Sequence, residues 1–589
     1  ATRTRDIHRL SLAQPRLITQ NFAFRNAGGL RFTNESAAWG FADTAIAHGM
    51  ALADLDGDGD LDVVVNNMNT PLGVYRNDAT ANRLAVSLQG RRSNRLALGA
   101  RIQATAGGRT QTREMTTSGG YLSSHEAVAV FGLGRDEVVD RLVVAWPSGG
   151  RTDLADVPAN TLLVVTEPAD DGPAGAEEAA ASPLFREVAA AAGARFLREE
   201  SVADDYGTQP LLPMRLSRFG PPVAWGDADG DGLADLFVGG SRGRPGAFFH
   251  NRGDGGFEAA EVPAIDDGTE AMGALWWPRG GGGHDLMTGR STVERRAASP
   301  APVVRRRGMG SDPGDAVVLT EAWSAGPLAA ADVNGDGFLD LFVGGRVQPG
   351  RYPLPVDSRL LLGGPRGLAP DLGQGDLANL GLVSGAVWTD ADGDGDPDLV
   401  VATEWGPVRL LRNDSGHLVD ATVAAGLADT TGRWNGVAAG DLDGNGSMDL
   451  VATNLGLNTP YRASPEEPLT LFAGDLDEDG ELDLVEAEWD GGRLYPRRGR
   501  RELADALPYT WKLFDSYKAF AHATLKDILH DRLKQATRVE ATTLAHMAFL
   551  NDGAGRFRGQ PLPPRAQLAV GFGVALADFD GDGRLDVYI

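Results

Sequence analysis

The sequence predicts an all-β fold, a seven-bladed β-propeller joined to a small all-β module and a helical insertion. Three observations predict it. A nine-residue acidic motif recurs seven times, glycine is abundant at 78 of 589 residues, and short β-prone runs follow most copies of the motif. Each repeat of this kind buries its faces only against its neighbours, so a ring of repeats is expected.

The motif has the pattern D-x-D/N-x-D/N-G-x-x-D. Its copies begin at Asp54, Asp227, Asp332, Asp390, Asp441, Asp475 and Asp578. A β-prone run follows most copies, and several then show an aromatic or leucine run that ends in Asn, as in residues 410–413. Each unit therefore predicts strand, acidic loop, strand, strand, glycine turn and strand, which is one four-stranded blade.

The spacing of the motifs predicts seven blades between residues 183 and 589. The 105-residue interval after Asp227 holds residues 274–286 near its middle, which have the flanks of a blade without the acidic ligands. They are interpreted as a degenerate unit. The 34-residue interval after Asp441 predicts a trimmed blade. The last interval predicts a helical insertion at about residues 502–544, with its apolar face packed on the propeller.

Residues 1–80 supply one further blade. Because one blade cannot bury both of its faces, these residues are interpreted as the remnant of an upstream propeller, with an eight-unit ring as the alternative. Residues 169–182 have the composition of a flexible linker. The chain begins with Ala1 and stops within an expected strand, so we expect a processed chain or a fragment of a longer protein.

The spacing within the motif fits a bound cation. Side chains at positions 1, 3 and 5 of a tight loop converge, and the invariant glycine at position 6 supplies a backbone with positive φ. Position 7 varies, as expected for a residue that offers only its carbonyl, and an invariant Asp at position 9 closes the shell. Several anionic oxygen donors suit Ca²⁺, so the sequence predicts up to seven calcium sites.

Two other interpretations of the motif were weighed. An EF-hand needs a Glu at position 12 and flanking helices, but only Glu486 meets the first condition, and strands are expected after the loops. A solvated acidic turn would explain one copy. It does not explain seven copies with the same Gly and Asp.

Charge and composition exclude several classes. The seven motifs hold 28 aspartates, so they account for nearly all of the net charge of −26. An acidic chain is a poor partner for nucleic acid. There is no cysteine, so disulfides and thiolate sites are excluded. No apolar stretch is long enough to span a membrane.

Catalytic signatures are weak, and we predict that the protein is not an enzyme. Residues 239–243 match G-x-S-x-G, but a nucleophile elbow needs a following helix and another strand is expected there. The nine histidines show no metalloprotease spacing, and His284 is expected in an exposed turn.

At these motifs the chain resembles the FG-GAP/VCBS repeats of integrin α-subunit propellers and many bacterial surface proteins. The resemblance implies calcium ligands at the side chains of positions 1, 3, 5 and 9 and at the carbonyl of position 7. These residues are Asp54, Asp56, Asp58, Asp60, Asp62, Asp227, Asp229, Asp231, Leu233, Asp235, Asp332, Asn334, Asp336, Phe338, Asp340, Asp390, Asp392, Asp394, Asp396, Asp398, Asp441, Asp443, Asn445, Ser447, Asp449, Asp475, Asp477, Asp479, Glu481, Asp483, Asp578, Asp580, Asp582, Arg584 and Asp586.

Residues 81–168 differ from the repeats. Alternating apolar residues and glycine turns predict a compact all-β module. Its GAR, FGLG and WPSG runs, at residues 99–101, 131–134 and 146–149, resemble the ASPIC/UnbV domain of the cartilage acidic protein family and its bacterial relatives.

These features predict a calcium-stabilised extracellular binding or adhesion protein that presents a propeller surface to a protein or polysaccharide. The expected location is secreted, cell-surface or periplasmic. Two alternatives stay open: a polysaccharide-active enzyme on the propeller face, and a structural partner of an outer-membrane uptake or secretion complex. No oligomeric state is predicted.

Overall fold

The computed structural model describes residues 21–589, with gaps inside this range. The gaps are residues 29–30, 42–43, 68–69, 120–121, 169–185, 198–202, 243, 261–269, 280–282, 294–303, 308–318, 320–321, 372 and 374. The expected linker at 169–182 therefore lies outside the described residues.

The described repeats form seven antiparallel sheets, which we number 1 to 7. In each of the first four, the first strand named below is the one that precedes the acidic or degenerate loop, and the other strands follow in the order in which they pair. Sheet 1 holds β39 (Ala575–Ala577), β40 (Asp586–Tyr588), β1 (Ala23–Asn26) and β2 (Phe32–Asn34); sheet 2 holds β3 (Ala47–Ala53), β4 (Asp62–Asn67), β5 (Gly73–Arg76) and β15 (Arg186–Glu187); sheet 3 holds β16 (Val223–Gly226), β17 (Asp235–Val238), β18 (Ala247–Asn251) and β19 (Phe257–Ala260); sheet 4 holds β20 (Ala271–Pro278), β21 (His284–Arg290) and β22 (Val304–Arg307).

Sheets 5 and 7 follow the same plan, and in sheet 6 the long second strand pairs with all three of the other strands. Their strands are β23 (Ser324–Ala331), β24 (Asp340–Val347), β25 (Arg359–Leu362) and β26 (Ala369–Pro370) in sheet 5; β27 (Leu382–Thr389), β28 (Asp398–Asn413), β29 (Leu418–Asp420) and β30 (Thr431–Arg433) in sheet 6; and β31 (Val437–Gly440), β32 (Asp449–Ala452), β37 (Met547–Asn551) and β38 (Phe557–Pro561) in sheet 7. The expected all-β class is confirmed.

The first strands of these sheets pack side by side. Strand β3 contacts β16, and contacts continue through β20, β23, β27 and β31 to β39, which contacts β3 again. Apolar residues on both faces of the sheets form the buried clusters between neighbours; Trp225, Val387 and Phe549 are fully or almost fully buried there. The sheets thus bury both faces against one another, as repeats must.

The two ends of the described chain meet in sheet 1. Strand β1 pairs with β40, with Phe24 opposite Val587, so the first described strands complete the sheet of the last ones. The interpretation of residues 1–80 as the remnant of an upstream propeller is therefore wrong for their described strands. The apolar faces of β1 and β40 are covered together within one cluster, which includes Phe24 and Val587.

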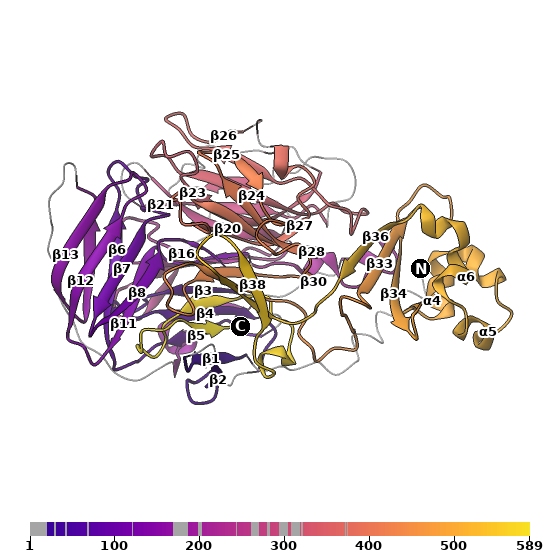
Figure 1. The fold of residues 1–589 in the computed structure, drawn as a ribbon, viewed down its shortest axis with the longest axis horizontal. Coiled ribbons are helices and arrows are strands. Elements are labelled where there is room, and N and C mark those ends of the chain that lie inside the picture. The colour runs from indigo at the N-terminus through magenta and orange to yellow at the C-terminus, as the bar shows by residue number, and fades with distance from the viewer. Residues whose placement is uncertain are drawn as a thin grey trace.

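The expected trimmed blade after Asp441 is also wrong. Strand β32 pairs with β37, almost a hundred residues later, and the chain between them forms an insertion with its own sheet. That insert sheet holds β33 (Leu469–Gly474), β34 (Asp483–Asp490), β35 (Arg493–Pro496) and β36 (Thr537–Ala541). It lies to one side of sheets 1 to 7 (Figure 1).

The helical insertion is confirmed in kind and shifted in extent. Its helices run from residue 500 to residue 534, and the expected end at 544 takes in strand β36. They are α4 (Arg500–Ala506), η3 (Pro508–Lys512), α5 (Tyr517–Ala521), α6 (Leu525–Leu529) and η4 (His530–Lys534). Their apolar side chains pack on the insert sheet, with Leu503 and Ile528 buried beside Phe472 and Val485, and not on the main sheets.

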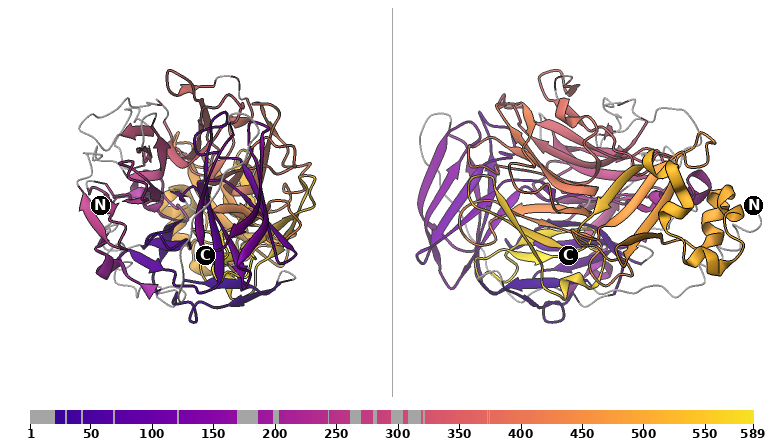
Figure 2. Two further views of the ribbon diagram at one scale, coloured as in Figure 1. Left: turned by 90° about the vertical axis from the view of Figure 1, so that its left-hand side faces the viewer. Right: turned by 45° about the vertical axis from the view of Figure 1, so that its right-hand side comes forward.

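The module at residues 82–166 consists of two packed sheets. The first holds β6 (Asn82–Gln89), β11 (Val128–Gly134) and β14 (Thr161–Thr166); the second holds β7 (Arg101–Ala106), β8 (Arg109–Glu114), β12 (Val138–Ala145) and β13 (Arg151–Pro158). The module and the insertion lie at opposite ends of the molecule (Figures 1 and 2).

A short hairpin of the module reaches between the main sheets. It consists of β9 (Ser118–Gly119) and β10 (Ser123–Ser124), and β10 pairs in parallel with β16 at Ala224. The hairpin contacts the first strands of sheets 2 to 7. It therefore occupies the space that these strands surround.

The remaining described helices are short. They are α2 (Ala189–Ala192), α3 (Asp205–Thr208), η1 (Leu216–Arg218), η2 (Gly375–Leu377) and η5 (Ala566–Leu568). Among the helices of the described residues, none has the length and apolar character to cross a bilayer.

Candidate metal centres

The seven acidic loops share one place in their sheets. Each joins the first strand to the second, and the Asp at position 9 is the first residue of the second strand in every copy. The glycine at position 6 has φ between 82° and 96° in all seven loops, which confirms the predicted positive φ. Six loops belong to the main sheets, and the loop at Asp475 belongs to the insert sheet.

The Asp at position 1 holds the loop in shape. In the first loop, Oδ1 of Asp54 accepts hydrogen bonds from the backbone N–H groups of Gly57 (2.9 Å) and Asp58 (3.1 Å), and Oδ2 accepts one from Gly59 (2.8 Å). Similar bonds recur in the other loops, for example from Gly393 to Asp390. The carboxylate is thereby fixed at the inner side of the loop.

The Asp at position 9 ties the loop to the third strand. Asp398 accepts N–H bonds from Ala391 (2.9 Å) and from Asn413 (2.7 Å) at the end of the third run of its sheet. Five other main-sheet loops make the same pair of bonds, and each of these carboxylates is buried. Burial raises the pKa of Asp398 to about 8 in spite of these bonds.

The carboxylates converge as the motif predicts. Oxygen atoms within 4.8 Å of one another come from positions 1, 3 and 5 in the first two loops and from positions 1, 3 and 9 in two others. These groups are Asp54, Asp56 and Asp58; Asp227, Asp229 and Asp231; Asp390, Asp392 and Asp398; and Asp441, Asp443 and Asp449.

Several loop carboxylate oxygens lack a hydrogen bond from the protein, which is the observation that fits a cation. Oδ1 of Asp56, both carboxylate oxygens of Asp60 and Oδ1 of Asp477 are buried without a hydrogen bond from the described residues. Burial, and after it the nearby Asp58 carboxylate, raises the pKa of Asp60 to about 8. Buried anionic oxygens need a compensating charge, and a divalent ion is one source of it.

Position 7 differs from the expectation in one loop. Only its carbonyl was expected to face the ion, and the exposed side chain of Phe338 agrees with that. The side chain of Asp60, however, is buried with its orphaned oxygens beside Arg83, whose Nη1 lies 3.5 Å from Oδ2. Asp60 therefore adds a carboxylate to the first loop.

A second set of residues, missed in the sequence, reaches the loops from the third strand. In four of the main sheets, the residue before the Asn that ends the third run lies near the carboxylate of position 3. Arg76 lies 3.7 Å from Asp56, Arg412 lies 4.0 Å from Asp392, and Arg25 pairs with Asp580. His250 holds this place in the third sheet. The signal was the residue before Asn in the runs VYRN, FFHN and LLRN.

The Asn itself links neighbouring loops. Its side-chain Nδ2 donates to the carbonyl of position 2 in the loop of the adjacent sheet. Asn413 donates to Val333 (2.8 Å), Asn551 to Ala391 (2.7 Å), Asn251 to Leu55 (3.2 Å) and Asn26 to Leu442 (3.0 Å). Because the same residue donates its backbone N–H to position 9 of its own loop, each link joins two loops.

The degenerate unit keeps this link without the acidic ligands. In sheet 4, Nη2 of Arg279 donates to the carbonyl of Ala228 (2.8 Å), which is position 2 of the loop in sheet 3. Nδ1 of His284 lies 2.6 Å from the carbonyl oxygen of Asp227. His284 is therefore half-buried against the neighbouring loop, and the expectation of an exposed turn is wrong.

The module covers the loops. Glu126 accepts the N–H of Asp54 (3.0 Å), and Glu114 accepts that of Asp390 (2.9 Å). Burial raises the pKa of both glutamates to about 7. Arg83 donates to the carbonyl of Asp58 (2.7 Å). The N–H of Gly132 donates to Asp578 (3.1 Å), so the module contacts loops of three different sheets.

The opposite ends of the strands carry a different buried cluster. Glu404 accepts hydrogen bonds from Arg346 (2.8 Å), from Arg433 (2.9 Å) and from the hydroxyl of Tyr352 (2.8 Å). Burial opposes ionisation, but the two guanidinium groups outweigh it and lower the pKa of Glu404. This carboxylate is neutralised by the protein itself.

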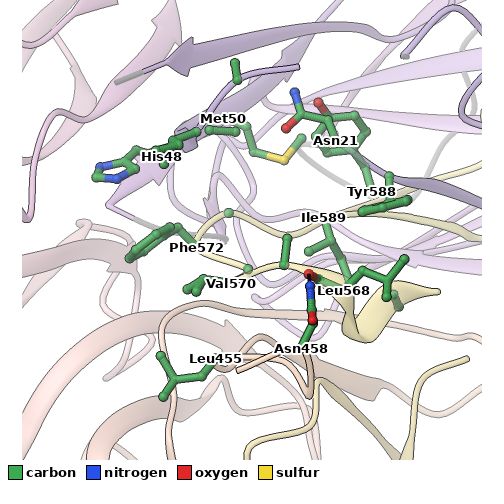
Figure 3. A pocket seen from close by; sticks show the side chains of 18 of the residues that line it. Asn21, His48, Met50, Leu455, Asn458, Leu568, Val570, Phe572, Tyr588 and Ile589 are labelled. Atoms are coloured by element: carbon green, nitrogen blue, oxygen red, sulfur yellow. Dashed lines mark hydrogen bonds between the residues drawn. The ribbon is translucent and has the colours of Figure 1, made fainter. Parts of the chain in front are cut away.

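A cavity of about 250 Å³ opens at the same end of the sheets. It is lined mainly by apolar groups from the start of β3, the end of β40 and residues 566–573. Figure 3 shows the ring of His48 beside Phe572, with Met50, Tyr588 and Ile589 around the cavity. None of its lining residues is acidic.

Two family models match parts of this chain. Residues 90–172 match the ASPIC and UnbV model, and residues 390–452 and 541–589 match the FG-GAP-like repeat model. These matches confirm both resemblances. The second match omits residues 453–540, which is the segment that strand pairing identifies as the insertion. Neither description names an enzyme activity.

Two curated relatives are cartilage acidic protein 1 from Mus musculus and from Homo sapiens. They are 33% and 32% identical over 130 residues, which are 21% of this chain and 20% of each relative. The chain thus spans about a fifth of the length of these relatives.

Likeness to solved structures is low. An Agrocybe aegerita protein described as recognising non-reducing terminal N-acetylglucosamine has a TM-score of 0.27 and 16% identity over 62% of this chain and 83% of that chain. Rhamnogalacturonan lyase PL11 from Bacillus licheniformis has a TM-score of 0.18 and 12% identity over 87% and 90%. At these TM-scores, neither likeness bears on the fold or the function.

Proposed function

We propose that this chain is a calcium-braced, seven-bladed β-propeller that serves as an extracellular binding scaffold, secreted, on the cell surface or in the periplasm. The cyclic contacts from β3 round to β39 support seven blades, with the first and last described strands sharing one blade. The matched FG-GAP and ASPIC families support a binding role.

The calcium part of the proposal rests on buried loop carboxylate oxygens that lack a hydrogen bond. Asp56, Asp60 and Asp477 hold buried carboxylate oxygens without a hydrogen bond from the described residues, although Arg83 lies 3.5 Å from Asp60. Bound Ca²⁺ would sit among the side chains of positions 1, 3, 5 and 9 and supply the missing positive charge. In the main sheets it would brace adjacent blades, because Asn side chains tie four pairs of neighbouring loops together.

The site favours binding over catalysis. The module hairpin occupies the space within the first strands, where a propeller enzyme would place its substrate. The cavity at the other end offers one histidine and no carboxylate. A protein or polysaccharide ligand would therefore contact the outer surfaces, with the metal loops as a rigid frame beneath the module.

Counting bound calcium tests the metal proposal. The chain is stripped with EGTA, dialysed against Ca²⁺ and analysed by mass spectrometry of the metal. We expect up to seven ions per chain, one fewer for Asp394→Ala, and no loss for Asp396→Ala at position 7 of the same loop. No retained calcium in the wild type would refute the proposal. A panel of glycans and extracellular proteins, screened in Ca²⁺ and in EGTA, then tests the scaffold role.

A further inference from the structure

The loop at Asp227 differs from its sister loops in one donor atom. His250 lies on β18, one residue before Asn251, and its Nδ1 is 3.5 Å from Oδ2 of Asp229 and 3.5 Å from Oδ1 of Asp235. These three atoms lie within 4.8 Å of one another. The sequence motif did not contain this histidine, because a separate strand delivers it.

The imidazole is held in place but has no hydrogen bond at that nitrogen. Nδ1 of His250 is buried and lacks a hydrogen-bond partner among the described residues. The ring packs edge-on against Phe248 at 4.7 Å and 86°. His284 reaches the same loop, but its Nδ1 contacts the carbonyl of Asp227 and not the carboxylates. The His250 side chain is 35% exposed, but its buried Nδ1 faces two carboxylates.

The corresponding residue in the other main-sheet loops cannot coordinate a metal. It is Arg76, Arg412 or Arg25 in three of them, where the guanidinium faces the position 3 carboxylate. It is Leu362 or Leu550 in the other two, next to the residues that bond Asp340 and Asp449. The sister loops therefore offer oxygen donors, whereas this one offers mixed nitrogen and oxygen donors.

We propose that Asp229, Asp235 and His250 form a site for a first-row transition-metal ion of the Zn²⁺ class. Imidazole nitrogen favours such ions, whereas Ca²⁺ takes oxygen. Two ligands on a tetrahedral ion at 2.0–2.1 Å are about 3.3–3.4 Å apart, close to the 3.5 Å that separates Nδ1 from each of the two carboxylate oxygens. Of the three ligands, Asp235 is fixed by N–H bonds from Ala228 (2.9 Å) and Asn251 (3.0 Å), which leave it lone pairs for the ion.

This inference concerns one loop of the proposed function. It rests on that function only in taking the loop as a cation site. The test uses the full chain without an affinity tag, stripped and then saturated with Ca²⁺, and titrated with Co²⁺ as a spectroscopic probe. Bound cobalt and calcium are counted separately. Failure of the calcium proposal would appear as absent calcium, whatever cobalt does.

We expect one cobalt ion per chain with the intense visible absorption of tetrahedral coordination. His250→Leu, the residue of two sister loops, should weaken cobalt binding by about 100-fold or more, since even outer-shell losses cost 10–100-fold. His250→Arg, the residue of three sister loops, should do the same. His417→Leu, at an exposed position, is the control and should bind as the wild type does.

Two results would overturn the inference. One is wild-type protein that binds no cobalt in excess calcium. The other is His250→Leu or His250→Arg protein that binds cobalt as tightly as the wild type, which would mean that His250 only forms an ion pair with Asp229 and Asp235.

Discussion

The two ends of the main sheets accommodate buried carboxylates in different ways. At one end, the buried loop carboxylate of Asp60 has no hydrogen-bond partner, and its pKa rises to about 8 although Arg83 lies 3.5 Å away. At the other end, Glu404 is enclosed by Arg346 and Arg433, and its pKa falls. This difference indicates that the loop end depends on a bound ion and that the arginine end does not. Chelation should loosen the loop end and leave the arginine end intact.

The largest effect is expected when the buried carboxylate of Glu404 is removed. Glu404→Gln leaves Arg346 and Arg433 buried without their anion, and breaking a buried pair costs roughly 3–5 kcal/mol of unfolding free energy. Urea denaturation in Ca²⁺ and in EGTA should give the same loss. A loss that appears only in one of the two buffers would show that the ends are coupled.

The second effect compares position 9 in two settings. Asp398→Ala removes the acceptor of two buried N–H groups and should cost about 2–4 kcal/mol, whereas Asp483→Ala in the insert sheet removes one such bond and should cost about 1–2 kcal/mol. Denaturation in EGTA measures both without the contribution of calcium. Equal losses would contradict the distinction between main and insert loops.

The third effect tests the links between loops. Asn413→Ala leaves the carbonyl of Val333 without its donor, also removes the side-chain bonds to Pro397 and from Gly416, and should cost about 1–3 kcal/mol. We expect it also to weaken calcium binding at the neighbouring Asp332 loop, since that carbonyl belongs to position 2 there. Calcium titration of this variant, with Asn458→Ala as an exposed control, would separate a link from a local contact.

The pH dependence of stability gives a further test, through one carboxylate of the module. Glu167 is buried, which raises its pKa, but bonds from the Ser148 hydroxyl and from the backbone N–H groups of Ser93, Arg91 and Arg92 outweigh this and lower the pKa to about 2. The folded pKa lies below the unfolded value of about 4.3, so its contribution is present above pH 4.3 and is lost as the pH falls to 2.

We therefore expect the wild-type module to lose roughly 1–2 kcal/mol of stability over this pH range. Glu167→Gln should lose that amount at neutral pH and show a flatter acid limb. Near-ultraviolet circular dichroism of Trp146 against pH would detect it. An unchanged acid limb in the variant would rule out Glu167 as the source.

The smallest effect concerns the insert loop. Glu478 has φ of 68° where the other loops place glycine. Glu478→Gly should stabilise this loop by about 0.5–1 kcal/mol by removing the strain, since its exposed pair with Arg532 contributes little. Hydrogen exchange of the Gly480 amide measures the stability of this loop. Gly393→Ala introduces the same strain into the Asp390 loop and should destabilise that loop.

Local geometry was predictable and long-range pairing was not. The loop positions, the positive φ of glycines such as Gly395, and the convergence of Asp390, Asp392 and Asp398 follow from spacing within nine residues. The pairing of β1 with β40 was missed, because 560 residues separate Asn26 from its acceptor Asp586. The insert sheet was missed because its loop repeats the motif of a blade while its strands pair only with one another.

By itself, the sequence determined the all-β repeats, the oxygen donors of each loop and the two matched families, since all of these are written in short contiguous patterns. Only the tertiary structure decided which residues complete each loop from outside. His250, Asn413 and Glu114 reach their loops from other strands, and the register between distant strands, set by packing of the whole molecule, fixes where such side chains point.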